Sequence, residues 1–349
     1  MTAFLQREGR VFFMPMEEWR ESGSVLRRLA RDWMAEVEGV IAGKRAVIER
    51  LVTACLCEGH VLLEDKPGVG KTTLVQALAA ASSLSFRRIQ FTPDQLPGDI
   101  TGGPVLNPQT MDMTYRPGPI MAQIVLADEI NRASPKTQSA LLEAMEERTV
   151  TADGETRPLP RPFMLLATQN PLRHEGTYPL PEAQLDRFLF RLRIGYPGKD
   201  EEMEMLERVR LCRPIGRVKP VIGADQLLAM QRAVRHVYVD HSIKRYIVEL
   251  AEATRHHPDL ELGLSPRGSI ALMRGAQAAA WLDGRDFVIP DDVKAVAEPV
   301  MAHRLVAKRH AAGFDAGEWL AALLKRTPVP QAARTPRGTA NGKTEAALL

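Results

Sequence analysis

Residues 62–74 read LLEDKPGVGKTTL, and the expected fold follows from this stretch. Its leading apolar residues predict a strand, the turn residues in its middle predict a tight loop, and its closing apolar residues predict a helix. Because glycine has no Cβ atom, Gly68 and Gly70 allow the loop to turn successive backbone N–H groups inward, beside the positive N-terminal end of the helix. A loop of this layout holds the phosphates of a nucleoside triphosphate.

Two side chains at the start of that helix suit a triphosphate and its metal ion. Lys71 is expected to reach the β and γ phosphates, and the Thr72 hydroxyl is expected to bind Mg²⁺. The residues expected to contact ATP are Pro67, Gly68, Val69, Gly70, Lys71, Thr72 and Thr73. Taken alone, the segment also fits an ordinary strand–turn–helix connection with a lone lysine.

Asp65 departs from the strict form of this loop, which has a glycine five residues before Gly70. A carboxylate close to a triphosphate repels it, unless the neighbouring Lys66 offsets the charge or the Asp65 side chain points away. The sequence leaves these possibilities open.

A second apolar strand, within IVLADEINRA at 124–133, carries two adjacent carboxylates at its carboxyl end. Ligands of open α/β sheets bind at that edge. Because adjacent strand residues point to opposite sides, Asp128 and Glu129 cannot do the same job. Asp128 suits the surroundings of Mg²⁺, reached through water, and Glu129 suits a general base that polarises the attacking water. Two solvated acids at a strand end are the alternative.

A third strand is predicted in FMLLATQNP at 163–171, which ends near Asn170 and is stopped by Pro171. An amide at this position can orient a water molecule against the γ phosphate of a nucleotide. A turn-capping asparagine is the alternative interpretation.

The segment YPLPEAQLDRFLF at 178–190 places Arg187 among residues that look like core. A guanidinium there must reach outward or onto a partner. It could stabilise transition-state charge in the site of a neighbouring subunit, but the spacing alone favours a salt bridge to Asp186 or Glu182.

In their order along the chain, these segments closely resemble the motifs of MoxR-type AAA+ ATPases, over roughly residues 35–310. The motifs are GHVLLEDKPGVGKT at 59–72, RIQFTPDQLPGDITG at 88–102, VLADEINRASPKTQSALLEAMEER at 125–148, LATQNP at 166–171, YPLPEAQLDRF at 178–188 and LSPRGS at 264–269. The resemblance implies an ATPase that uses ATP and Mg²⁺ and assembles into a ring.

The resemblance also implies a role for each candidate residue. Lys71 and Thr72 would bind nucleotide and metal, Asp128 would be the Walker-B acid, and Glu129 would be the catalytic glutamate. Asn170 would be the sensor-1 asparagine that positions water.

Two arginines acquire roles from the same resemblance. Arg187 corresponds to the arginine finger, which acts on the nucleotide of an adjacent subunit. Arg267 corresponds to the sensor-2 arginine of a helical lid, which we expect to swing over bound nucleotide as the lid closes.

The pattern along the chain predicts an α/β fold, namely a P-loop AAA+ core with a parallel sheet flanked by helices, plus a smaller all-α lid domain. The expected strands are 61–63, 88–91, 124–127, 163–167 and 189–194. Helical stretches such as 72–82 and 136–147 alternate with them. The expected lid helices are 225–237, 242–256, 265–281 and a last one from Pro290 to before Pro299, with Asp225, Ser242 and Ser265 as possible caps.

We expect four parts in the chain. Residues 1–34 would form an N-terminal arm, irregular and then mildly amphipathic; 35–214 would form the core, 215–325 the lid and 326–349 a disordered tail. Two inserted hairpins are predicted in the core, at 98–118 and at 148–162, the second from its Asp153-Gly154 pair. In the resembling family such inserts line the pore of a ring and contact the protein being remodelled, whereas surface decoration is the alternative.

Composition limits the possible functions. The chain has 349 residues, of which 45% are hydrophobic and 26% charged, so it can bury a full core. A net charge of +3 and an aromatic content of 5% predict no nucleic-acid groove. No apolar stretch approaches a bilayer span, which favours a soluble, cytoplasmic protein. Three cysteines are too few for a disulfide framework, and buried thiols are expected at Cys55 and Cys57.

These observations favour a ring-forming ATPase, a hexamer by the family's usual state, that remodels a protein client. Relatives of this kind work with partners that carry a von Willebrand factor A domain. Two alternatives remain at this stage. One is a nucleotide-gated scaffold that hydrolyses weakly because Asp65 impairs the loop, and the other is a phosphotransferase.

Overall fold

The computed structural model describes residues 3–7, 10–14, 16–109, 111–152, 154–170, 177–211, 214–308, 311 and 313–330. Asp153, Pro171 and most of the tail expected at 326–349 lie outside these described residues.

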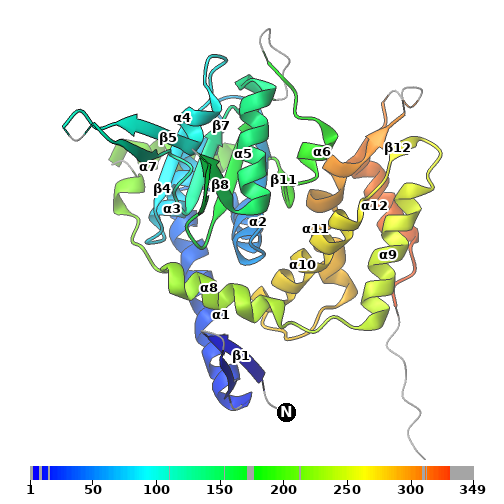
Figure 1. Cartoon of the computed structure of the whole chain (residues 1–349). Coiled ribbons are helices and arrows are strands. Elements are labelled where there is room, and N and C mark those ends of the chain that lie inside the picture. The colour runs from blue at the N-terminus through cyan, green and yellow to red at the C-terminus, as the bar shows by residue number, and fades with distance from the viewer. Residues whose placement is uncertain are drawn as a thin grey trace, which may run out of the picture.

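A five-stranded, fully parallel sheet forms the centre of the molecule, with strand order β11-β3-β10-β7-β4 (Figure 1). Its strands are β3 (Val61–Glu64), β4 (Phe86–Gln90), β7 (Ile124–Asp128), β10 (Met164–Gln169) and β11 (Phe190–Leu192). Each overlaps a segment where the sequence predicts a strand, although β4 begins two residues before its predicted start, and the predicted α/β fold class is confirmed.

Alternating residues of these strands pack against helices on the two faces of the sheet. Leu126 of β7 belongs to the cluster that includes α2 (Arg45–Leu56) and α3 (Lys71–Ala80). Val125 belongs to the opposite cluster, with α5 (Pro135–Glu147). Every residue of β7 is buried, as the apolar run of a central parallel strand requires.

The expectation that the N-terminal arm begins irregularly is wrong, whereas its expected amphipathic part forms a helix. A hairpin of β1 (Ala3–Arg7) and β2 (Arg10–Met14) precedes α1 (Met16–Glu38), a helix that continues past residue 34 and packs on α2 and α3. Trp33 is fully buried, and its indole N–H donates to the carbonyl oxygen of Leu78 at 3.1 Å. The second half of α1 is therefore part of the core, because a buried Trp ring contributes a large apolar area.

Two antiparallel hairpins interrupt the core. β5 (Gly102–Leu106) pairs with β6 (Met113–Pro117) after the short α4 (Pro97–Thr101), and β8 (Thr149–Ala152) pairs with β9 (Glu155–Pro158). The first hairpin extends away from the sheet in Figure 1. The guanidinium of Arg157 lies 3.9 Å from the ring centroid of Tyr115, so the two hairpins contact each other.

Beyond the core, α6 (Glu182–Leu185) precedes β11, and α7 (Lys199–Leu211) leads to the helical part of the chain. The helices there are α8 (Ala224–Arg235), α9 (His241–Arg255), α10 (Pro266–Leu282), α11 (Pro290–Met301) and α12 (Ala316–Arg326), with a small pair of strands, β12 (Leu260–Leu262) and β13 (Val306–Ala307). This is the predicted helical lid, in which α10 packs along α11 (Figure 1).

The ends of these helices differ in part from expectation. Ser265 caps α10 as predicted, its hydroxyl accepting from the Gly268 N–H at 3.1 Å. Asp240, rather than Ser242, caps α9, and Gly223 rather than Asp225 precedes α8. Pro299 lies within α11 instead of beyond it, because the helix continues into the buried Val300 and Met301.

Within the part of the chain that the structure describes, no helix combines the length and apolar character needed to cross a bilayer. Cys55 and Cys57 are buried free thiols, as expected.

Candidate functional site

The loop between β3 and α3 opens onto the carboxyl edge of the sheet. Gly68 and Gly70 have φ angles of 82° and 89°, a left-handed conformation that favours glycine, and Gly70 directly precedes the first residue of α3. The loop borders a cavity of about 390 Å³. Its lining residues are Pro67, Gly68, Gly70, Lys71, Thr72, Thr73, Arg88, Gln90, Asp128, Glu129, Thr168, Gln169 and Asn170.

The structure thus gathers most of the predicted site residues around one cavity. Val69 is the exception within the loop: it is not among the lining residues and packs against the core cluster, as its apolar side chain favours. Arg88 and Gln90 of β4 and Thr168 of β10 line the cavity although the sequence analysis did not assign them. Gln90 and Thr168 lie near the carboxyl ends of the strands on either side of Asp128, and Arg88 lies two residues before Gln90, so their nearness to this edge of the sheet could have indicated them.

Lys71 is folded back onto its own loop. Its Nζ donates to the carbonyl oxygens of Asp65 at 2.5 Å and Lys66 at 2.9 Å. Burial lowers the pKa of Lys71, an effect opposed by the nearby charges of Asp65, Asp128 and Glu129. A bound phosphate would offer this ammonium a stronger, charge-assisted acceptor than two carbonyls.

Asp128 is the most connected side chain of the cavity. The Thr168 hydroxyl donates to its Oδ1 at 2.5 Å, and the Thr72 hydroxyl to its Oδ2 at 3.3 Å. Arg88 donates to the same Oδ2 from Nε at 3.0 Å and from Nη2 at 2.6 Å. The Thr72 hydroxyl and the Asp128 carboxylate form a set of hard oxygen donors beside the phosphate loop, which is the chemistry that fits Mg²⁺.

Glu129 adopts an unusual backbone conformation. Its φ of 59° is left-handed, and its N–H donates to the Thr168 hydroxyl at 2.8 Å. The Glu129 carboxylate pairs with Arg132 Nε at 2.5 Å. Non-glycine residues in this region of φ are uncommon and cluster at functional sites. Asn170 lines the same cavity, so the structure brings the expected base and the expected water-orienting amide to one place.

The structure resolves where the Asp65 side chain points. Its Oδ2 accepts the N–H groups of Ile194 at 2.8 Å and Gly195 at 2.6 Å, just after β11, and its Oδ1 accepts the Lys66 N–H at 2.7 Å. Partial burial alone would raise the pKa of Asp65, but these N–H donors and the charge of Lys71 lower it below its ordinary value. Asp65 is not among the lining residues of the cavity, so it anchors the loop to the chain leaving β11.

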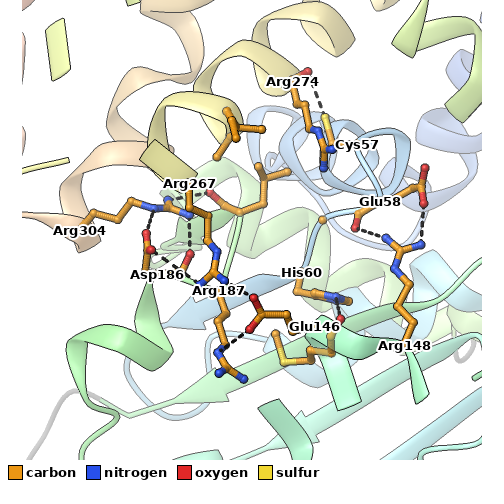
Figure 2. A pocket seen from close by; sticks show the side chains of 15 residues that line it. Cys57, Glu58, His60, Glu146, Arg148, Asp186, Arg187, Arg267, Arg274 and Arg304 are labelled. Carbon is orange, nitrogen blue, oxygen red and sulfur yellow. Dashed lines mark hydrogen bonds and ion pairs between the residues drawn. The ribbon is translucent and has the colours of Figure 1, made fainter. Parts of the chain in front are cut away.

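Arg187 and Arg267 lie elsewhere, around a second cavity of about 200 Å³ that no residue of the 67–73 loop lines. Arg187 Nη1 donates to the Leu142 carbonyl at 2.7 Å, and its Nε lies 3.2 Å from Glu146 Oε2. Arg267, from the lid, pairs with the other oxygen of Glu146, and both ion pairs can be followed in Figure 2. Arg267 therefore does not lie over the phosphate loop of its own chain, where the sequence analysis expected it.

This second cavity is rich in arginines from core and lid. Its arginines are Arg148, Arg187, Arg267, Arg274 and Arg304 (Figure 2). The sequence analysis considered a salt bridge between Arg187 and Asp186, but Asp186 does not pair with Arg187. Its Oδ1 instead accepts from Arg304 Nε at 2.8 Å, and its Oδ2 lies 3.8 Å from Arg267 Nη1. Arg187 and Arg267 are thus neighbours, and they line a different cavity from the phosphate loop of their own chain.

Comparison with known proteins agrees with this architecture. Residues 60–190 match the family model described as "ATPase family associated with various cellular activities (AAA)", and residues 252–322 match an AAA lid domain. The chain is 57% identical to the protein YeaC of Bacillus subtilis over 270 residues, 77% of this chain and 84% of that protein. It is 43% identical to the chaperone MoxR1 of Mycobacterium tuberculosis over 280 residues, 78% of this chain and 74% of that protein.

A solved structure is also similar. The crystal structure of a candidate ATPase from Cytophaga hutchinsonii has a TM-score of 0.85 and 36% sequence identity, and the match covers 90% of this chain and 99% of that one. A P-loop α/β core followed by a helical lid defines the class of AAA+ ATPases. Within that class, the chain belongs to the MoxR family, as its motifs indicated.

The anchoring role of Asp65 generates a first prediction. Asp65→Asn is expected to lower the melting temperature by a few degrees at neutral pH, because charge-assisted hydrogen bonds to the loop and to Gly195 are lost. Since the folded pKa of Asp65 lies below the unfolded one, this difference should be full above about pH 4 and disappear as the pH falls further.

Thermal unfolding from pH 7 to pH 3 measures this effect, with Asp200→Asn on α7 as the matched exposed control. ATP affinity should not increase in Asp65→Asn, because the carboxylate already faces away from the cavity. Tighter ATP binding by this variant would show instead that Asp65 repels the nucleotide.

Proposed function

We propose that this protein is an ATPase that assembles into a ring, in which each nucleotide lies between two subunits, and that it remodels a protein client. The single observation that carries the proposal is the division of the charged residues into two cavities. One holds the phosphate loop with Asp128 and Glu129, and the other holds Arg187 and Arg267. A heterologous contact that repeats around a closed ring would bring the two cavities of adjacent copies together.

In this proposal the predicted site residues of the first cavity have defined tasks. The N–H groups of the 67–73 loop and the Lys71 ammonium bind the phosphates. Thr72 would hold Mg²⁺ and Asp128 would reach it through water, and the ion would supply positive charge at the phosphates. Glu129 accepts a proton from water, which Asn170 orients toward the γ phosphate. Glu129 forms an ion pair with Arg132 in the structure. This ion pair has to break before the Glu129 carboxylate can act on water.

The arginine cavity supplies charge from the adjacent subunit. Arg187 and Arg267 share the Glu146 carboxylate, and the contact of Arg267 with Asp186 is longer, at 3.8 Å, and shared with Arg304, so the two guanidinium groups can accept further negative charge. A γ phosphate of the neighbouring copy would satisfy both. We therefore place Arg267 with Arg187 on the neighbour's nucleotide rather than on its own.

The client-contacting surface is proposed at the first inserted hairpin. Val105, Leu106, Met111 and Met113 are exposed at its end, with 71% of Met111 and 61% of Met113 accessible to solvent. Exposed apolar side chains of this kind mark contact sites for other proteins, and methionines adapt to varied surfaces. A client that carries a von Willebrand factor A domain, a six-membered ring and a cytoplasmic location are further parts of the proposal, which rest on the family alone.

The alternative of a weakly hydrolysing scaffold has lost its motivating observation. It assumed that Asp65 impairs the loop, but the Asp65 carboxylate is bound by the N–H groups of Ile194 and Gly195. No feature of the described residues favours a phosphotransferase over attack by water.

The assignment of the general base generates a second prediction. Glu129→Gln should retain Mg·ATP binding within about threefold and lose roughly two to four powers of ten in turnover, because the amide cannot accept the proton of water. Phosphate release and nucleotide titration measure the two quantities. Glu143→Gln, an exposed change on α5, is the matched control. Turnover in Glu129→Gln equal to wild type would end the assignment.

The proposed placement of both arginines generates a third prediction, tested by mixing variants. Arg187→Ala and Arg267→Ala should each be inactive alone. Each should recover activity when mixed with Glu129→Gln, to roughly a quarter of wild type if subunits assort at random, because some interfaces then combine an intact site with intact arginines.

A mixture of Arg187→Ala with Arg267→Ala should recover nothing, because each interface receives both arginines from one subunit and always lacks one of them. Recovery in this mixture would show that Arg267 acts on the nucleotide of its own chain. Failure of every mixture to recover would make both arginines structural.

A further inference from the structure

Arg88 of β4 has no part in the proposed reaction so far, yet it donates two hydrogen bonds to the candidate metal-binding carboxylate of Asp128. Its Nη2 and Nε donate to Asp128 Oδ2 at 2.6 and 3.0 Å, and Nη2 also donates to Gln90 Oε1 at 2.6 Å. The Arg88 side chain is 44% exposed and lines the phosphate cavity. Arg88 therefore places a guanidinium group in the phosphate cavity of its own chain, unlike Arg187 and Arg267, which line the other cavity.

Strand geometry explains why Arg88 reaches this place. Gln90 lies in register with Asp128 across the β4–β7 pair, and Arg88 is two residues earlier on the same face of the strand. Arg87 and Ile89 alternate to the other face, where Ile89 joins the cluster that contains α5. A matched pair of neighbouring arginines therefore exists, of which only Arg88 belongs to the cavity face.

The contact occupies a particular oxygen. Asp128 Oδ1 is bonded to the Thr168 hydroxyl, whereas Oδ2 faces the Thr72 hydroxyl at 3.3 Å, on the side where the donor set fits Mg²⁺. Arg88 covers this Oδ2. Because Asp128 is buried, its charge needs a cationic or hydrogen-bonding partner when no metal is bound.

We propose that Arg88 holds the metal side of Asp128 in the empty site and gives up this position when nucleotide binds together with Mg²⁺. The proposal rests on the nucleotide site proposed above. Oδ2 already accepts two bonds from Arg88 and one from Thr72, so Mg²⁺ or a water bound to it could reach this oxygen only after Arg88 has moved away. Arg88 is therefore a positioning residue that couples nucleotide binding to the presence of the metal ion.

The test compares nucleotide affinity with and without Mg²⁺. Dissociation constants for a fluorescent ATP analogue are measured in EDTA and in saturating Mg²⁺ for wild type, Arg88→Gln, Arg88→Lys and Arg87→Gln. Without Arg88 the metal-free complex loses a cation beside the phosphates, while the metal complex loses a competitor of Mg²⁺. The ratio of the two constants, EDTA over Mg²⁺, should rise about tenfold in Arg88→Gln.

The controls separate this role from a structural one. Arg87→Gln should keep the wild-type ratio, and Arg88→Lys should stay near it because the charge is retained. A merely structural Arg88 would weaken both complexes by the same factor, and an unchanged ratio in Arg88→Gln would overturn the proposal.

A second arm requires no nucleotide. Mn²⁺ titrated into the nucleotide-free proteins, followed by electron paramagnetic resonance, should bind severalfold more tightly to Arg88→Gln than to wild type and Arg87→Gln. If wild type bound no nucleotide in either condition, the proposed function would fail, and equal Mn²⁺ affinities would then separately reject the competition between Arg88 and the metal.

Discussion

The buried carboxylate of Asp128 is the contact on which the architecture of the site depends. It lies at the carboxyl end of β7 and is bonded to Thr168 of β10, Thr72 of α3 and Arg88 of β4. One side chain thus fixes three neighbouring strands and the helix that follows the phosphate loop. Because a buried carboxylate must be paired, each of these partners is held in place, and the loop is oriented by the same network.

Two of the predicted site arginines lie outside this network. The phosphate cavity contains Lys71 and Arg88, but Arg187 and Arg267 are paired with Glu146 around a different cavity that includes lid residues. In the proposal, the chain therefore presents one half of a phosphate site at each of these two cavities. Assembly, lid position and catalysis become linked in the proposal because the same arginines contact the lid, the core and the neighbour.

Much of the fold was predictable, and the reasons are local. Apolar runs such as Ile124–Asp128 are long enough to identify buried parallel strands. The glycines of the 67–73 loop also predicted a tight turn, because glycine adopts the left-handed backbone angles that Gly68 and Gly70 have in the structure. The orientation of Asp65 could not be predicted, since its partners at Ile194 and Gly195 are distant in sequence. For the same reason Arg88 was missed, and Arg267 was expected over its own loop. The burial of Trp33 agrees with the amphipathic pattern expected before residue 35, but its partner Leu78 on α3 is too distant in sequence to be predicted.

Calorimetric titration of Mg·ATP into wild type and Lys71→Ala tests most directly whether the Asp128 edge of the sheet is the nucleotide site. The account predicts one nucleotide per chain in wild type and a loss of about 100-fold in affinity in Lys71→Ala, since a charge-assisted contact to phosphate is removed. Lys136→Ala, an exposed change on α5, should bind as wild type does. Equal affinity of Lys71→Ala and wild type would contradict the account.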